Sequence, residues 1–234
     1  MKIRLLGQAG VRIDLKNGTQ ILVDPYLTDT LREKKGDRFA RLVPPPENME
    51  SLDPDILLIT HDHGDHMDMA TLERWLDAKA RLPVLGPYPV YQAVAGRWPS
   101  KHNCMVMRPG VEVSLNDACI CAVPAFHETP EAVGYLVMAE GKTLYFTGDT
   151  LYSRRIPEFL KEERIDVMFV CINGFGNNMN VSDAARLTQV LHPALAVPVH
   201  WDMFRAFGAE PESFTSCLTA VPARILRAYE QIEL

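Results

Sequence analysis

The chain has 234 residues, of which 47% are hydrophobic and 23% are charged. This length can bury a sizeable core in one or two domains, and the composition excludes a disordered, collagen-like or low-complexity chain. With 24 Lys and Arg residues against 30 Asp and Glu residues, the net charge of −6 offers no long-range attraction for nucleic acid or for an anionic membrane.

The N-terminal third is predicted to form three short strands, at residues 2–6, 11–15 and 20–23, because apolar residues alternate or run together there. Lys, Asn and Gly at 16–18 favour a hairpin turn between the second and third strands. Residues 28–50 are polar and charged and contain three consecutive prolines, which predicts a long irregular excursion. Loops of that length in a compact domain are usually functional or mobile.

Strands and helices alternate through the rest of the chain. The continuous apolar run at 56–60 predicts a strand buried on both faces, and Asp68 is expected to cap a helix over 69–79. Further strands are predicted at 83–86, 104–107, 111–115, 118–123, 133–139, 142–146, 166–171, 194–199 and either 223–226 or 230–234. Further helices are predicted at 88–95, 153–161 and 211–219, with one more that is capped by Ser182 or Asp183. This pattern predicts one domain, residues 1–234, of the α/β (α+β) class.

The sequence has no feature of an exported or membrane-spanning protein. Its apolar start is broken by Gln8, Arg12 and Asp14 before a signal-peptide core could form, and no uncharged run reaches the ~18 residues of a membrane helix. The five cysteines are odd in number and have no metal-ligand spacing, and Cys119 and Cys121 would share one strand face as buried thiols. These features predict a cytoplasmic protein without disulfides and without a membrane partner.

Histidine is concentrated in one short motif. Three of the seven histidines occur in His61-x-His63-x-Asp65-His66, directly after the strand predicted at 56–60. From composition alone, such a pattern is expected only about 4×10⁻⁴ times in a chain of this length. Imidazole and carboxylate donors suit divalent metal ions, and a loop at a strand's end can direct closely spaced side chains toward two points. The motif therefore predicts a metal site.

Three further candidate ligands also follow predicted strands: His127, Asp149 and His200. Asp24 closes the strand at 20–23 in the same way. Because the ends of several strands can converge on one edge of a sheet or sandwich, these residues could complete a site for two metal ions. Five of the seven histidines would then lie in one place.

The whole series of candidate residues resembles the metallo-β-lactamase superfamily. All five motifs of that superfamily are present, in its order and at its spacings: Asp24, His61-x-His63-x-Asp65-His66, His127, Asp149 and His200. The resemblance implies a four-layer αβ/βα sandwich with a dinuclear metal centre at its edge. It also implies a role for each residue: one metal ion held by His61, His63 and His127, the other held by Asp65, His66 and His200, a bridging carboxylate from Asp149, and an orienting carboxylate from Asp24.

Within that superfamily, the stretches 60–68, 148–153 and 198–204 are similar to the L-ascorbate-6-phosphate lactonase group. The stretch from Asn173 to Asp183 is similar to the same group. That group is often manganese-dependent and cytoplasmic. The resemblance implies a hydrolase for a small anionic lactone or ester.

The expected chemistry is metal-assisted hydrolysis. Two divalent ions would lower the pKa of a bridging water from ~15.7 toward neutrality and make it a hydroxide nucleophile. Asp65 could orient this hydroxide and pass on its proton, and is the predicted catalytic residue. Nitrogen and oxygen ligands suit zinc, manganese or iron. Asn173 and Arg205 are candidates for substrate binding, Arg205 through a bidentate contact with an anionic group.

Two other functions remain open at this point. A phosphodiesterase or nuclease of the same superfamily would use the same ligands, but the charge of −6 argues against long nucleic acid and leaves only a small phosphodiester. A non-catalytic metal-binding sensor would need a closed coordination sphere. The expected partner is a small-molecule substrate, and the sequence is compatible with a homo-oligomer.

Overall fold

The computed structural model describes residues 1–46, 48–79, 81–99, 103–129 and 131–234, whose strands form two β-sheets. The first sheet has seven strands, in the order β13 (Gln231–Glu233), β1 (Lys2–Gly7), β2 (Gly10–Asp14), β3 (Gln20–Val23), β4 (Ile56–Leu58), β5 (Val84–Gly86) and β6 (Cys104–Val106). The second sheet has six strands, in the order β12 (Leu195–Val199), β11 (Val167–Cys171), β10 (Lys142–Phe146), β9 (Val133–Ala139), β8 (Ala118–Pro124) and β7 (Glu112–Leu115). The strands lie close to their predicted positions, and the last one adopts the alternative at 230–234.

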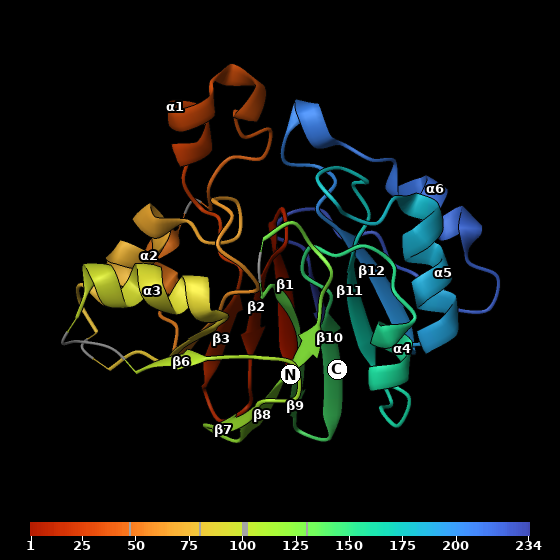
Figure 1. Ribbon diagram of the computed structural model, residues 1–234, viewed down its shortest axis with the longest axis horizontal. Coiled ribbons are helices and arrows are strands. Elements are labelled where there is room, and N and C mark those ends of the chain that lie inside the picture. Colours follow the sequence, from red (N-terminus) through yellow and green to blue (C-terminus); the bar gives the residue numbers. More distant parts are fainter. Residues whose placement is uncertain (47, 80, 100–102, 130) are drawn as a thin grey trace.

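Helices cover the outer face of each sheet, so that the molecule has four layers (Figure 1). The first sheet is covered by α2 (Met69–Leu76) and α3 (Tyr88–Arg97). The second sheet is covered by α4 (Arg155–Phe159), α5 (Val181–Leu191) and α6 (Pro211–Cys217). The predicted four-layer αβ/βα sandwich is thus confirmed.

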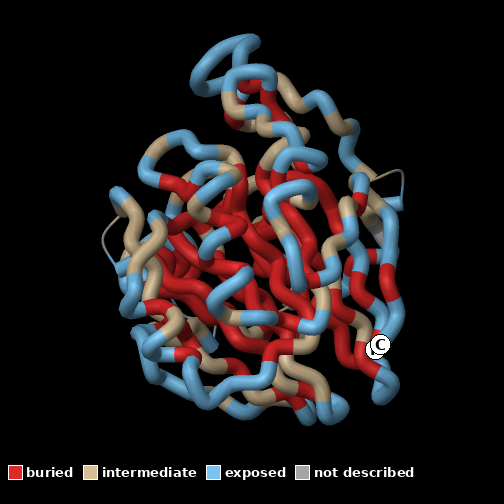
Figure 2. The backbone as a smooth tube through the Cα atoms, turned by 90° about the vertical axis from the view of Figure 1, so that its right-hand side faces the viewer, coloured by how far each residue is buried: buried red, intermediate tan, exposed pale blue. Residues whose placement is uncertain are grey.

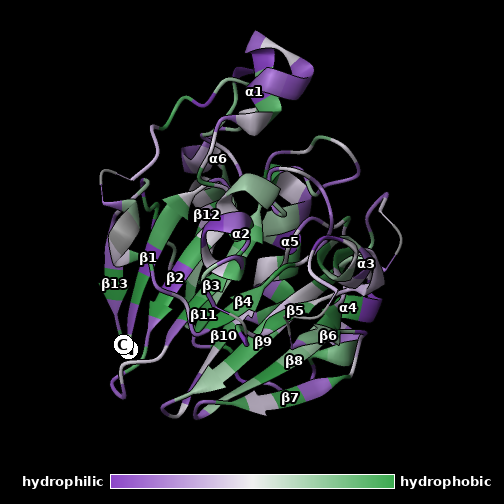
Figure 3. Cartoon of the chain, turned by 90° about the vertical axis from the view of Figure 1, so that its left-hand side faces the viewer, coloured by the Kyte–Doolittle hydropathy of each residue, from purple (hydrophilic) through white to green (hydrophobic). Residues whose placement is uncertain are grey.

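Alternating side chains along the strands build the central core between the two sheets. Ile56 and Leu58 of β4 point into this core, whereas Leu57 between them packs with α2 and α3. All three residues are fully buried, as the uninterrupted apolar run predicts. Figure 2 shows the buried segments gathered in the interior, and Figure 3 shows apolar strands beneath more polar helices and loops.

The two ends of the chain lie in neighbouring strands. Strands β1 and β13 pair antiparallel, with Ile3 opposite Ile232, and the N and C labels lie close together in Figure 1.

No helix in the described part of the chain is long and apolar enough to cross a membrane.

The cysteines differ in part from the prediction. All five are free thiols. Cys119 and Cys121 do share one face of β8, but they are only half-buried. Strand β8 lies next to the edge strand β7, so Cys121 sits at the border of the helix-side cluster and Cys119 lies outside that cluster.

The excursion at 28–50 is more ordered than predicted. It contains the helix α1 (Thr30–Lys35) and two 3₁₀ turns, η1 (Asp37–Phe39) and η2 (Met49–Ser51). Residues 30–39, which we call the arm, project from the body of the sandwich (Figures 1 and 3).

The arm is anchored by only two buried apolar side chains. Leu31 and Phe39 pack against Tyr26, Met203 and Phe204 in a small cluster of their own. Two apolar residues at this separation produce no periodic signal, which explains why the sequence indicated an irregular segment.

Asp68 precedes α2 as predicted, but its side chain does not cap that helix. It accepts hydrogen bonds from the backbone N–H of Thr28 at 3.0 Å and from the hydroxyls of Thr28 at 2.7 Å, Thr30 at 3.1 Å and Thr71 at 2.6 Å. Because Thr28 and Thr30 lie at the start of the arm, this buried carboxylate ties the arm to α2.

The cap of α5 also differs from the prediction. Asn180 caps the helix, with its Oδ1 accepting from the backbone N–H of Asp183 at 2.9 Å. Asn180, Ser182 and Asp183 are all good capping types, so composition alone does not determine which of them begins the helix.

Candidate metal centre

The predicted ligands converge at one edge of the sandwich, where strands from both sheets end. The motif at 61–66 lies between β4 of the first sheet and α2. His127, Asp149 and His200 follow β8, β10 and β12 of the second sheet. The sandwich therefore brings together side chains that are up to 139 positions apart, from His61 to His200.

His61, His63, His127 and Asp149 form the first half-site, with one donor atom from each lying within 4.8 Å of the others. His127 Nε2 lies 3.2 Å from His63 Nδ1. Asp149 Oδ2 lies 3.9 Å from His127 Nε2 and 4.0 Å from His61 Nε2.

Asp65, His66 and His200 form the second half-site, again with donor atoms within 4.8 Å of one another. His200 Nε2 lies 3.2 Å from both His66 Nε2 and Asp65 Oδ2. Asp149 Oδ1 lies 3.3 Å from His66 Nε2 and 3.4 Å from His200 Nε2. The two oxygens of Asp149 thus face different half-sites, which is the arrangement that a bridging carboxylate requires.

The positions of these donor atoms are better explained by bound metal ions than by hydrogen bonds among the side chains. His61 Nε2 and Asp149 Oδ1 are buried and make no hydrogen bond, and such orphaned polar atoms are costly unless something else binds them. Two ligands that are each ~2.1 Å from one tetrahedral ion lie about 3.4 Å apart. The facing nitrogens of His63 and His127 and of His66 and His200, both 3.2 Å apart, are close to that separation.

The electrostatics of the first half-site favour the protonation states that bind metal, whereas in the second half-site Asp149 outweighs burial and raises the pKa of His66 and His200. Burial, followed by the neighbouring His66, lowers the pKa of His61 well below its usual value. Burial alone would raise the pKa of Asp149, but His200 and His66 outweigh it and hold the pKa well below the usual range. A neutral imidazole and an ionised carboxylate are the forms that coordinate a cation.

Asp24 contacts one of the predicted ligands directly. Its Oδ2 lies 2.8 Å from His66 Nδ1, which leaves Nε2 of that ring to face the second half-site. The same carboxylate accepts from Thr60, at 2.8 Å from the backbone N–H and 2.6 Å from the hydroxyl. Asp24 therefore fixes both a ligand ring and the loop before His61, a common arrangement around metal-binding histidines.

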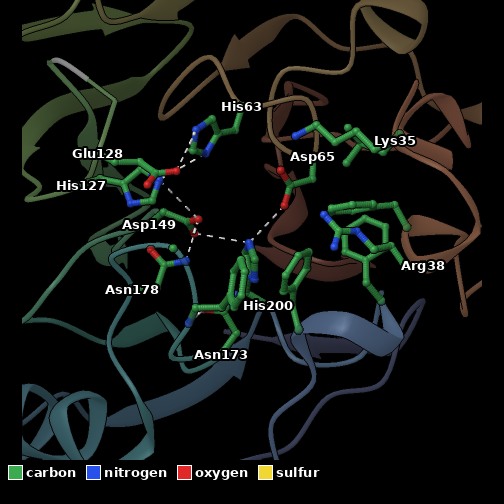
Figure 4. Close-up of a pocket in the computed structure, with 16 residues that line it drawn as sticks. Lys35, Arg38, His63, Asp65, His127, Glu128, Asp149, Asn173, Asn178 and His200 are labelled. Atoms are coloured by element: carbon green, nitrogen blue, oxygen red, sulfur yellow. Dashed lines mark hydrogen bonds and ion pairs between the residues drawn. The ribbon is translucent and has the colours of Figure 1, made fainter. Parts of the chain in front are cut away.

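A cavity of about 350 Å³ opens above the two half-sites (Figure 4). Asp65, His127, Asp149 and His200 lie in its lining. Its size is within the usual range for small-molecule sites.

The comparison with known proteins identifies the family. A family model described as the beta-lactamase superfamily domain matches residues 19–201. The chain belongs to the metallo-β-lactamase superfamily. The resemblance inferred from the sequence is thus confirmed.

Relatives in this superfamily include a UPF0173 metal-dependent hydrolase from Pyrococcus abyssi, which is 29% identical over 245 residues that cover all of both chains. A probable L-ascorbate-6-phosphate lactonase from Escherichia fergusonii is 27% identical over 258 residues, which cover 88% of this chain and 71% of that protein. A solved structure, a possible metal-dependent hydrolase from Veillonella parvula, has a TM-score of 0.82 at 18% identity, covering 100% of this chain and 99% of that one. At that identity the structural likeness concerns the fold.

Of the two predicted substrate-binding residues, Asn173 and Arg205, only Asn173 lies in the lining of the cavity. Asn173 lines the cavity, whereas Arg205 is exposed in the 3₁₀ turn η3 (Arg205–Phe207) and is not part of the lining. Arg205 is close to His200 in the sequence, but this closeness does not determine whether its side chain faces the cavity. The cations that line the cavity are Lys35 and Arg38 of the arm.

Two buried amides, neither of which was expected to position a ligand, hold the carboxylates of the site. Gln8 Nε2 donates to Asp65 Oδ2 at 2.7 Å and lies 3.0 Å from His200 Nε2. Asn178 Nδ2 donates to Asp149 Oδ2, also at 2.7 Å. Gln8 occurs in a Gly-rich turn and Asn178 in a loop rich in Gly and Asn, and such compositions indicate a turn without indicating this role.

Backbone strain is also concentrated at the site. Gln8, Asp24 and His200 have φ angles of 55°, 43° and 64°, a region that non-glycine residues rarely adopt. The backbone N–H of His200 donates to the carbonyl of Gln8 at 2.8 Å, so two of these residues stabilise each other. Strain of this kind is typical of functional sites.

Cys171 is a further neighbour of the centre. Its Sγ lies in a third group with donor atoms of Asp149 and His200 within 4.8 Å, although it donates to Asn173 Oδ1 at 3.4 Å. The five cysteines have no metal-ligand spacing in the sequence. Cys171 reaches this position because β11 lies between β10 and β12 in the sheet.

Proposed function

We propose that the protein is a metal-dependent hydrolase that cleaves a lactone or ester bond in a small anionic molecule. The observation that carries the proposal is the position of Asp149 between two half-sites of imidazole and carboxylate donors, with one oxygen directed to each. The relatives named as a metal-dependent hydrolase and a probable lactonase support the same reaction class.

Two divalent ions bound by these residues would provide Lewis acids and would make water nucleophilic at neutral pH. The protein's own groups prepare the reaction. Asp24 and Gln8 hold His66 and Asp65 in place, and Asn178 holds Asp149. Their hydrogen bonds keep the donor atoms in position before any substrate arrives.

Asp65 is the residue that we assign to proton transfer, because its carboxylate lines the cavity. Burial would raise the pKa of Asp65, but His66 and His200 outweigh burial and keep the pKa below its usual range. The group therefore stays ionised, and its Oδ2 is fixed by Gln8. It can orient the attacking water and accept its proton, although a low pKa makes it a weak base.

The test is a hydrolysis screen of sugar lactones, carboxylic esters and phosphodiesters, using protein purified without chelator and supplied with Mn²⁺ or Zn²⁺. We expect turnover of lactones or esters and a loss of at least about 100-fold in His61→Ala and Asp149→Ala, because each removes a ligand. His192→Asn is the matched control, since His192 ends α5 in a left-handed conformation that Asn tolerates.

The control should retain full turnover, and circular dichroism should show that all three variants are folded. Activity on phosphodiesters alone would contradict the assigned bond type. Unchanged turnover in Asp149→Ala would contradict the assigned site.

A further inference from the structure

One wall of the cavity is built from aromatic rings. Phe39 of the arm, Phe204 and Phe207 near η3, and Phe175 of the loop after β11 all line it. Their ring centroids form a continuous series: Phe39 to Phe204 is 5.9 Å, Phe39 to Phe207 is 5.2 Å, and Phe207 to Phe175 is 4.0 Å. The side chains of this wall offer no hydrogen-bonding group, and they suit the flat face of an apolar ring.

Two cationic side chains, Lys35 and Arg38, lie over the ring of Phe39 in the same wall. Lys35 Nζ lies 5.4 Å and the Arg38 guanidinium 4.8 Å from the centroid of Phe39. Both side chains are exposed, and neither forms an ion pair with a carboxylate in the described part of the chain. Arg32 of the same arm, by contrast, pairs with Asp29 and Asp37. The unpaired cations therefore face the cavity with their charge available.

The opposite side of the cavity has the opposite charge. Glu128 Oε1 lies 3.6 Å from His63 Nε2, and Figure 4 shows Glu128 and His127 across the cavity from Lys35 and Arg38. An anionic group would be repelled by Glu128 and attracted to the arm. The cavity thus has a charged end at the arm, an apolar wall beside it, and the metal ligands at its floor.

We propose that the cavity takes an ester or lactone with an aromatic body and an anionic group remote from the bond that is cleaved. The ring packs against Phe39, Phe175 and Phe207, and the anion lies between Lys35 and Arg38. This assignment rests on the proposed hydrolytic function and specifies its substrate class. A carboxylate and a phosphate share the required charge, so the test includes both.

The test uses four methyl esters that differ in one property each. Monomethyl terephthalate carries a ring and a carboxylate, and methyl 4-(phosphonooxy)benzoate carries a ring and a phosphate. Methyl 4-carbamoylbenzoate is a neutral compound of nearly the same shape as the first. Monomethyl adipate keeps the carboxylate but has no ring. Because the intrinsic reactivities of these esters differ, kcat/KM of each variant is compared with that of the wild type on the same ester.

The double variant Lys35→Gln/Arg38→Gln should lower kcat/KM about 10-fold for the two anionic aryl esters and less than about 2-fold for the neutral one. Phe175→Ala should lower kcat/KM about 5-fold for all three aryl esters and less than about 2-fold for monomethyl adipate. Phe175 is 54% exposed, so its removal does not disturb the core. Lys34→Gln on the arm and Phe159→Ala on α4 are the matched controls, since both residues are exposed and neither lines the cavity.

An equal loss on charged and neutral esters in the double variant, or an equal loss on aryl and alkyl esters in Phe175→Ala, would overturn the inference. Wild-type activity confined to monomethyl adipate or to sugar lactones would also overturn it while leaving the proposed function intact. A metal-loaded wild type that hydrolyses no ester or lactone would overturn both.

Discussion

Two amide side chains, Gln8 and Asn178, decide how firmly the carboxylates of the metal centre are held. Each donates one hydrogen bond of 2.7 Å, Gln8 to Asp65 and Asn178 to Asp149. Gln8 is 2% exposed and Asn178 is 6% exposed, so water cannot easily replace either donor. Since Asp65 belongs to one half-site and Asp149 faces both, the two amides should affect metal binding differently.

Gln8→Met keeps the length of the side chain but removes the donor. We expect about 10- to 100-fold weaker binding of one metal ion, at the half-site of Asp65, His66 and His200, with the other ion unaffected. Asn178→Leu should weaken both ions, because Asp149 is shared. Calorimetric titration of metal-free protein with Zn²⁺ or Mn²⁺ measures the two affinities, and two wild-type affinities in Gln8→Met would refute the assigned role.

The candidate metal ligands could be selected from the sequence because the spacing of the motif at 61–66 is itself improbable. Among the residues around them, Asp24 and Asn173 were selected from the sequence, but the others were not. Gln8 occurs in a short Gly-rich turn, a composition that does not indicate any contact with a metal ligand. Lys35 and Arg38 lie in a segment that was expected to be irregular. Arg205 was near His200 in sequence, but η3 directs it to solvent. Only the fold determines which side chains near the ligands face the cavity.

The arm is the element whose structure was least evident in the sequence, because it is anchored by few contacts. Strands were predictable since each carries an alternating or continuous apolar pattern, whereas the arm buries only Leu31 and Phe39. Its second attachment is polar, through the hydrogen bonds of Asp68 with Thr28 and Thr30. The position of the cavity's cations therefore depends on this small apolar cluster and on one buried carboxylate.

Asp68→Ala should destabilise the protein by about 2–4 kcal/mol, because the backbone N–H of Thr28 and the hydroxyls of Thr30 and Thr71 lose their acceptor. It should also speed hydrogen exchange of the amides in residues 30–39 more than elsewhere. Urea unfolding and hydrogen-exchange mass spectrometry measure the two effects. Glu162→Ala, at an exposed position after α4, is the control and should change neither. A loss of stability without faster exchange in the arm would contradict the anchoring role.

The sandwich as a whole explains why the site lies where it does. The motif at 61–66 extends from the first sheet, and His127, Asp149 and His200 extend from the second. Metal ions bound between them would join the two sheets at this edge. Binding to the folded state alone stabilises it by about 2.7 kcal/mol when the free ion is at 100 times its Kd.

Removal of metal should therefore lower the thermal stability of the whole molecule. We expect Tm to fall when excess chelator is added to metal-loaded protein and to recover when Mn²⁺ or Zn²⁺ is restored. Asp149→Asn should show a much smaller difference between the two states, because the shared carboxylate is lost. Differential scanning calorimetry measures the change, and an identical Tm with and without chelator would contradict the coupling between metal and fold.

The central claim is that these residues form one dinuclear centre around Asp149. The most direct measurement is a crystal structure of metal-loaded protein with anomalous scattering recorded at the absorption edge of the metal. We predict two anomalous peaks, one surrounded by His61, His63 and His127 and the other by Asp65, His66 and His200, with Asp149 between them. A single peak, or peaks away from Asp149, would contradict this account.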